Sequence, residues 1–268
     1  MRLACCSQMI PETSLTAKAK KAREWGLQEI SVFIEHDSWE PSLRRELLGL
    51  AQNTGVRPCE LVLVGAVYGH MMDEDPEIRR RCRAMYRESA QVCAELGAVA
   101  EIEFEYLTQD PLPLFEFDAR LNDKQEQIFV ECYQGLLQEV AGSEGHILIE
   151  PLNRYESRYV NTVAESLRLV GRVDSLNAGL LLDCFHMSIE ERSIVDAIVE
   201  AGSHTKHVHL AENNRKMPGE GSLEWPAIFA ALQDIGYDGT ISFECSTSRS
   251  ADAAVPKSVK FVRQLLAH

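Results

Sequence analysis

The strongest constraint on the fold is an alternation of two kinds of segment that repeats eight times along the 268 residues. Each short run is rich in aliphatic and β-branched residues, and each is followed by a longer run with apolar residues at helical spacing. The expected strands are Leu3–Ser7, Glu29–Ile34, Cys59–Val64, Val99–Tyr106, His146–Glu150, Gly179–Asp183, His207–Ala211 and Thr240–Glu244. The expected helices are Leu15–Trp25, Ser42–Asn53, Glu77–Leu96, Asp123–Val140, Val163–Val173, Ile194–Ala201, Trp225–Ile235 and Ala253–Ala267.

Strands that alternate with helices are joined by right-handed crossovers, which make the strands parallel. Eight such units close a sheet into a (β/α)8 barrel, and barrels of this kind have roughly 250 residues. No linker or low-complexity tract interrupts the pattern. The sequence therefore predicts a single TIM barrel domain over residues 1–268, with a parallel eight-stranded barrel surrounded by helices.

Composition limits the partners and the compartment. A formal net charge of −14 repels phosphate backbones, so nucleic acid is not an expected partner. No apolar run reaches the roughly 18 residues that span a bilayer, and the N-terminus lacks a secretory signal, so we expect a soluble protein with no membrane partner. Eight cysteines without a CxxC pair are typical of reduced thiols in a cytoplasmic protein.

Four of the expected strands end in residue types that bind metal ions, namely Glu150, Asp183, His209 and Glu244. The carboxyl ends of parallel barrel strands share one rim, where barrel enzymes place their chemistry. One acid there could simply cap a helix, but three carboxylates on one rim repel each other unless a cation neutralises them. Three carboxylates and one imidazole favour Mn2+ first, and then Mg2+ or Co2+, over thiolate-bound zinc.

Three stretches around these strand ends resemble a known family. Ile149–Glu156, Leu182–Glu191 and His207–Gly221 are similar to the xylose-isomerase-like TIM barrels, a family of sugar phosphate isomerases and epimerases. Within that family the resemblance is to the ketose 3-epimerases that act on sugars such as tagatose and psicose. It is specific over about residues 146–246.

The resemblance implies a set of roles for individual residues. Glu150, Asp183, His209 and Glu244 correspond to the four metal ligands, and Glu150 and Glu244 also to the acid and base that invert a carbon through a cis-enediolate. Glu156, His186 and Arg215 correspond to residues that hold the hydroxyls and the carbonyl of the sugar. Homo-oligomers, either dimers or tetramers, are usual in the family.

Other functions remain open at this point. An aldose-ketose isomerase, including the hydroxypyruvate type, uses the same enediolate, and a sugar-acid decarboxylase or dehydratase needs the same metal. A non-catalytic sugar-binding barrel is less favoured because all four ligands are present. An abasic-site endonuclease is disfavoured because we find neither the additional histidines nor a basic groove.

Three further features of the sequence are not explained by the resemblance, and we give an expectation for each. Glu101, Glu103 and Glu105 alternate along the fourth strand, so they either contact sugar hydroxyls or, as we expect, pair with buried arginine or lysine. The segment Thr108–Asn122 is expected to form a loop over the barrel mouth. The hydroxyl-rich stretch Cys245–Ser250 resembles a phosphate loop without the glycines, so we favour a non-phosphorylated sugar and a rim position for Arg249.

Overall fold

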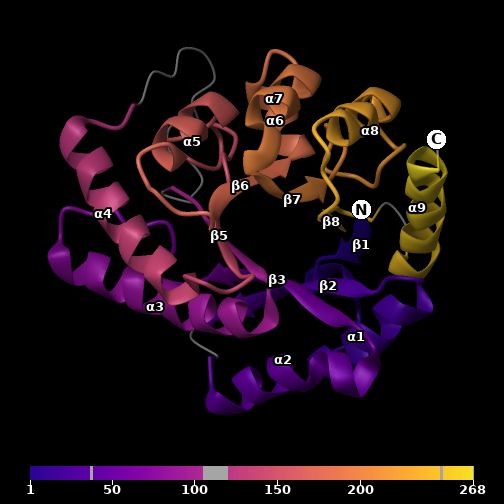
Figure 1. Cartoon of the computed structure of the whole chain (residues 1–268). Coiled ribbons are helices and arrows are strands. Elements are labelled where there is room, and N and C mark those ends of the chain that lie inside the picture. The colour runs from indigo at the N-terminus through magenta and orange to yellow at the C-terminus, as the bar shows by residue number, and fades with distance from the viewer. Residues whose placement is uncertain (37–38, 105–119, 248–249, 268) are drawn as a thin grey trace.

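The computed structural model describes residues 1–36, 39–104, 120–247 and 250–267, and its strands form one parallel eight-stranded sheet (Figure 1). The strands are β1 (Arg2–Cys5), β2 (Glu29–Glu35), β3 (Arg57–Val64), β4 (Val99–Ile102), β5 (His146–Ile149), β6 (Ala178–Asp183), β7 (Thr205–Leu210) and β8 (Thr240–Phe243). From β2 to β8 each strand pairs with the next one in chain order, and β8 pairs with β1. Between β1 and β2 a single parallel bridge joins Cys6, directly after β1, to Ser31 on β2, so the strands form the expected barrel, which is nearly closed.

Helices surround this barrel (Figure 1). They are α1 (Leu15–Glu24), α2 (Pro41–Thr54), α3 (Pro76–Leu96), α4 (Asp123–Val140), α5 (Val163–Val170), α6 (Cys184–Glu190), α7 (Ile194–Ala201), α8 (Trp225–Asp234) and α9 (Ala251–Leu266). The expected helices are all present, with ends that differ by a few residues. The short helix α6 was not expected, because it begins directly at the end of β6 with no turn residue between them. Within the described residues, no helix has the length and apolar character needed to cross a bilayer.

Local sequence signals explain where the helices begin and end. Asn122 and Thr162 each form a capping box with the residue three positions later, which satisfies the free N–H groups at the start of α4 and α5. Gly55 and Gly97 end α2 and α3 with φ values of 75° and 63°, a backbone conformation that side chains other than glycine rarely adopt. These boundaries fix where each following strand starts.

The barrel interior differs from the layer between strands and helices. The helix-facing side of the strands packs in one large apolar cluster, whereas the interior cluster consists of Val99, Leu148 and Leu181 alone among the described residues. The interior also holds buried polar side chains, including Glu60, Glu101, His207 and His209. Polar groups in such a place need partners or a function.

Some expected features fall outside the described residues. Most of the segment Thr108–Asn122 lies there, and so do Glu105 and Arg249. The strand that was expected to reach Tyr106 ends at Ile102 in the part that is described.

Candidate active site

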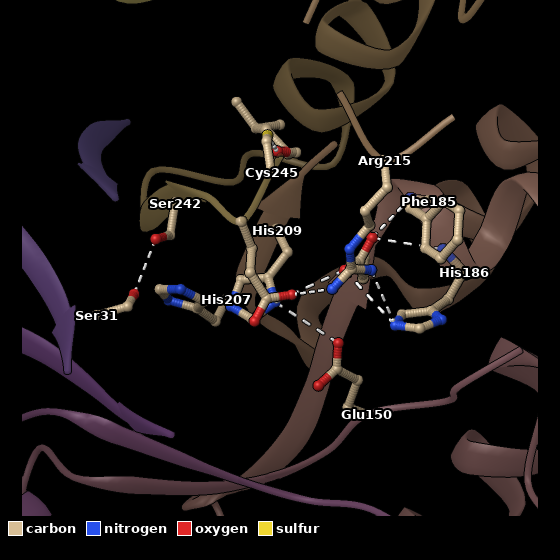
Figure 2. A network of polar contacts seen from close by, with 12 residues as sticks. Ser31, Glu150, Phe185, His186, His207, His209, Arg215, Ser242 and Cys245 are labelled. Carbon is tan, nitrogen blue, oxygen red and sulfur yellow. Dashed lines mark hydrogen bonds and ion pairs between the residues drawn. The ribbon is translucent and has the colours of Figure 1, made fainter. Parts of the chain in front are cut away.

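The four expected ligands meet around His209 at the carboxyl rim of the barrel. Its Nδ1 atom lies 3.6 Å from Glu150 Oε1, 3.8 Å from Asp183 Oδ2 and 3.5 Å from Glu244 Oε2 (Figure 2). Asp183 and His209 end or nearly end β6 and β7, and Glu150 and Glu244 directly follow β5 and β8. Four consecutive strands thus bring one imidazole and three carboxylates to a single point.

Two buried atoms at this point have no hydrogen-bond partner among the described residues. They are His209 Nδ1 and Glu150 Oε1, and both residues are almost completely buried. Buried polar atoms normally have a partner, so two of them that face each other 3.6 Å apart indicate a place for a further group. Asp183, His209 and Glu244 offer ligand atoms that lie close enough together to hold one ion, and Glu150 forms a second such group with Asp183 and His186. Carboxylate oxygens and an imidazole nitrogen fit a divalent cation.

The acidic side chains of the cluster produce an electrostatic field that stabilises a positive charge at its centre. Burial raises the pKa of Glu150 to about 7, although the neighbouring His209 acts in the opposite direction. Burial alone lowers the pKa of His209, but Glu60 and Glu244 outweigh this and hold it well above its usual value. Acidic side chains therefore dominate the field at His209.

The residues expected to hold the sugar border this cluster. Arg215 Nη1 lies 3.0 Å from Asp183 Oδ2 and 3.2 Å from His186 Nε2, and Arg215 Nη2 donates to Glu244 Oε2 (Figure 2). The guanidinium also stacks 4.7 Å above the ring centre of Phe185. Arg215 is thus held against two of the expected metal ligands and beside His186.

His186 is fixed from its other side by Asn153. The backbone N–H and the side-chain amide of Asn153 contact His186 Nδ1 at 3.1 and 2.8 Å, and the same amide donates to Glu156 Oε1 at 2.8 Å. Burial and the nearby Arg215 lower the pKa of His186 to about 3, so the ring is neutral. Because the Asn153 backbone N–H donates to Nδ1, the neutral ring carries its proton on Nε2, so the 3.2 Å approach of Arg215 Nη1, itself a donor, is a contact and not a hydrogen bond. This Nε2–H can donate to a sugar oxygen.

Two further buried acids support the site, and neither was singled out from the sequence. Glu212 is fully buried and accepts hydrogen bonds from Gly219 N at 2.7 Å, Leu223 N at 3.1 Å and Trp225 Nε1 at 2.6 Å. It therefore fixes the loop that carries Arg215. Glu60 reaches His209 from the opposite side of the barrel. The only sign of Glu60 in the sequence was that it is an acidic residue within the largely apolar strand β3.

The expected pairing of the fourth-strand acids with arginine or lysine is wrong for Glu101. Both of its carboxylate oxygens are buried without a partner among the described residues. Burial, reinforced by Glu60 and Glu150, raises the pKa of Glu101 well above its usual value, which favours the neutral form of its carboxyl group. Burial also raises the pKa of Glu103, against a hydrogen bond from Tyr68.

A cavity of about 610 Å3 opens beside these residues. Its lining includes Cys6, Gln8, Met9 and Phe33 from the first two strand ends, and Arg215, Glu244, Cys245, Ser246 and Thr247 from the last two. The volume is in the range of small-molecule sites. Within the described lining, Arg215 is the one cationic side chain.

Comparison with known proteins agrees with this geometry. A family model described as Xylose isomerase-like TIM barrel matches residues 19–265. The D-psicose 3-epimerase of Ruminiclostridium cellulolyticum is 34% identical over 175 residues, which are 65% of this chain and 59% of that protein. The 3-dehydro-D-guloside 4-epimerase of Escherichia coli is 34% identical over 110 residues, 41% of this chain and 42% of that protein. The matched part thus covers less than two thirds of either relative.

A solved structure shows the same fold over the full length. D-Psicose 3-epimerase with D-tagatose from Clostridium cellulolyticum H10 superposes with a TM-score of 0.83 over 99% of both chains, at 24% sequence identity.

Proposed function

Because this chain belongs to the xylose isomerase-like TIM barrel family, we propose that it is a ketose 3-epimerase that depends on a divalent metal ion. The observation that carries the proposal is the convergence of Glu150, Asp183 and Glu244 on the unpartnered Nδ1 atom of His209. A ketose offers a carbonyl and a neighbouring hydroxyl, which suit such a centre. Mn2+ is the proposed ion because the donor set is mostly carboxylate oxygen.

Glu150 and Glu244 are the proposed proton carriers. An ion held by Glu150, Asp183, His209 and Glu244 would supply polarisation of the sugar carbonyl and make the adjacent C3–H bond acidic. The two glutamates approach from β5 and β8, on either side of His209. One carboxylate takes the C3 proton from one face of the sugar, and the other, as a carboxylic acid, returns a proton to the opposite face of the planar cis-enediolate.

His186, Arg215 and Glu156 position the sugar. The Nε2–H of the neutral His186 ring donates to a sugar oxygen, and the guanidinium of Arg215 stabilises negative charge that develops on oxygen. Glu156 accepts from a sugar hydroxyl while Asn153 holds its other side. None of these three groups needs to carry the carbon-bound proton.

The proposed substrate is a free sugar and not a sugar phosphate. In the described lining of the mouth cavity, hydroxyl and amide groups such as Gln8, Ser246 and Thr247 accompany the single cation Arg215. That cation is already engaged with Asp183 and Glu244. A phosphate is bound most strongly by charge-assisted hydrogen bonds, and the described lining offers no second cation for them.

A second candidate is epimerisation at C4 of an oxidised glycoside. It is favoured by the cavity of about 610 Å3, which has room for a substituent beyond one sugar ring, and by the Escherichia coli relative that bears this activity in its name. Both reactions remove the proton from the carbon next to a ketone, which is C3 beside the C2 carbonyl of a ketose or C4 beside the C3 carbonyl of the glycoside, and both would use the same proton carriers.

Proton NMR in D2O tests the proposal and separates the alternatives. The Mn2+-loaded protein is incubated with a panel of free ketoses, their terminal phosphates and a 3-keto-glycoside. Deuterium at C3 together with the inverted ketose supports the 3-epimerase, whereas exchange at C4 of the keto-glycoside supports the second candidate. An aldose product would indicate an isomerase, and loss of CO2 or water from a sugar acid would indicate a decarboxylase or dehydratase. Absence of exchange with every ketose would reject the proposal.

A further inference from the structure

We infer that Glu60 is a positioning residue, which holds His209 in the tautomer and orientation that a metal ligand requires. Both carboxylate oxygens of Glu60 lie 3.0 Å from His209 Nε2, and Glu60 Oε2 lies 3.3 Å from His207 Nε2. The three side chains are at most 2% exposed. The inference rests on the proposed metal site, although its test does not depend on catalysis.

The shape of the barrel explains how Glu60 reaches His209. Glu60 lies on β3 and His209 on β7, and these strands are four apart in either direction around the eight-stranded barrel. Their interior side chains therefore face each other across the axis. His207 shares the interior face with His209, and the two imidazole planes stand at 90°. One carboxylate can thus face the Nε2 atoms of both rings.

The hydrogen-bond direction sets the tautomer of His209. An ionised carboxylate only accepts, so each Nε2 atom that bonds to it has to carry a proton. When an ion binds, His209 gives up its Nδ1 proton, and the neutral ring keeps the Nε2 proton that faces Glu60, which leaves the lone pair on Nδ1. Nδ1 is the atom that faces Glu150, Asp183 and Glu244 without a hydrogen-bond partner. The contact with Glu60 therefore leaves the correct nitrogen free for an ion.

Among the described residues, no other side chain has a hydrogen bond to His209 Nε2. The ring is buried, so bulk water cannot replace Glu60 as acceptor. Groups that orient a metal-bound histidine in this way typically account for a 10–100-fold effect on metal affinity. We expect the same range for Glu60.

The group Glu60, His207 and His209 also has the spacing of a metal site in its own right. An ion at that position would need unprotonated Nε2 atoms on both rings, and His209 would then have to bridge two ions as an imidazolate. The hydrogen bond from His209 Nε2–H to Glu60, with His207 Nε2 in close contact at 3.3 Å, accounts for the same distances without a second ion. Measured stoichiometry separates the two readings, because positioning requires one ion per chain and a second site requires two.

Glu60→Gln is the direct test. An amide has one accepting oxygen in place of two and carries no charge, so the contact that orients His209 is weakened, and its NH2 group opposes the Nε2–H of whichever ring it faces. The apoprotein is titrated with Mn2+ alone, and free Mn2+ is measured by electron paramagnetic resonance. The dissociation constant is expected to rise 10–100-fold in Glu60→Gln, with one ion still bound per chain at saturation.

Glu101→Gln is the matched control. Glu101 lies on the neighbouring strand, is equally buried and has no hydrogen bond to either histidine among the described contacts. Its Mn2+ dissociation constant is expected to stay within about threefold of wild type. The double variant Glu60→Gln with His207→Gln removes the opposed donors, so its Mn2+ affinity should recover toward wild type.

Several results would overturn the inference. One is a Glu60→Gln protein, folded by circular dichroism, that binds Mn2+ within threefold of wild type, and another is two ions per wild-type chain. If Glu60→Gln does not fold, the double variant Glu60→Gln with His207→Gln takes its place in the test. A folded double variant that binds Mn2+ 10-fold more weakly than wild type would contradict the idea that Glu60 sets the tautomer of His209. Failure of the proposed function looks different: Mn2+ binding then depends on Glu60, but no sugar exchanges deuterium.

Discussion

Glu212→Gln should destabilise the protein and weaken sugar binding, because Glu212 fixes the loop between β7 and α8. Its carboxylate accepts three hydrogen bonds in a fully buried position, two of them on Oε1 and one on Oε2. A glutamine can keep the two bonds to Gly219 N and Trp225 Nε1. Its NH2 group would then face Leu223 N–H, so one bond is lost and one donor is left unsatisfied.

The expected cost follows from that single loss. Leaving a fully buried donor unsatisfied costs about 1–3 kcal/mol, and Leu223 is only partly buried, so the free energy of unfolding should fall by about 1 kcal/mol. For a chain of about this size the midpoint of thermal unfolding falls by roughly 2–4 °C per kcal/mol. Arg215 lies in the same loop with a φ of 60°, so we also expect a higher KM for the sugar, with Mn2+ affinity retained.

Urea unfolding of the apoprotein measures the change in the free energy of unfolding, because no bound ligand adds to the stability. The control is Glu224→Gln, an exposed glutamate nearby whose side chain makes no capping bond, and it should stay within about 0.5 kcal/mol of wild type. Equal unfolding free energies for Glu212→Gln and wild type would show that the three bonds add no net stability. An unchanged KM would show that the loop does not need Glu212 to place Arg215.

Three further predictions concern charge and metal. Chelation should remove about one divalent ion per chain together with activity, and added Mn2+ should restore both the ion and the activity. Metal analysis by mass spectrometry measures the number of ions per chain. A metal-free protein with full activity would contradict this prediction. Glu150→Gln and Glu244→Gln should each lower kcat at saturating Mn2+ by roughly 1000-fold or more with the fold intact, because each removes a proton carrier; near-normal rates in either would exclude the two-glutamate scheme. Glu101→Gln should have a larger free energy of unfolding than wild type, and this difference should grow as pH rises above about 4.5. The reason is that Glu101 stays protonated in the folded wild type but ionises in the unfolded chain, which stabilises the unfolded state. The difference should grow by up to about 1.4 kcal/mol per pH unit. Urea midpoints at pH 5 and pH 8 test this sign, and an equal gain at both values would refute it.

Much of the fold could be predicted from the sequence because its signals are local. Apolar periodicity gives the type of each element, and capping residues give its ends, as at Asn122 and Gly97. Helix α6 (Cys184–Glu190) was missed because Asp183 both ends β6 and caps the helix, so no turn separates them. A single domain over residues 1–268, a cytoplasmic location and a homo-oligomer stay predictions.

The candidate site, like the fold, could be predicted only where its signals are local in the sequence. Strand ends and side-chain alternation were sufficient to group Glu150, Asp183 and His209, because parallel strands share a rim. Glu60 lies 149 residues from His209, and only closure of the barrel brings them together. Alternation also placed Glu101 in the interior, but it carries no information about a partner, and the expected arginine or lysine is absent among the described residues.

The buried acids of the barrel interior are accommodated in three different ways, which explains how so acidic an interior can be stable. Burial raises the pKa of Glu60, but His207 and His209 outweigh it and hold the pKa well below the usual value, so Glu60 is ionised and paired. Glu101 has no such partner and remains a neutral acid. Around His209, the group of three carboxylates is matched in part by Arg215 and, in our proposal, by a divalent ion. Because Glu60 and Glu101 lie on adjacent strands and repel one another when both are charged, the ionised form of Glu60 favours the neutral form of Glu101. The hydrogen bond that leaves His209 Nδ1 free for metal therefore also depends on which of these two neighbouring acids carries the proton.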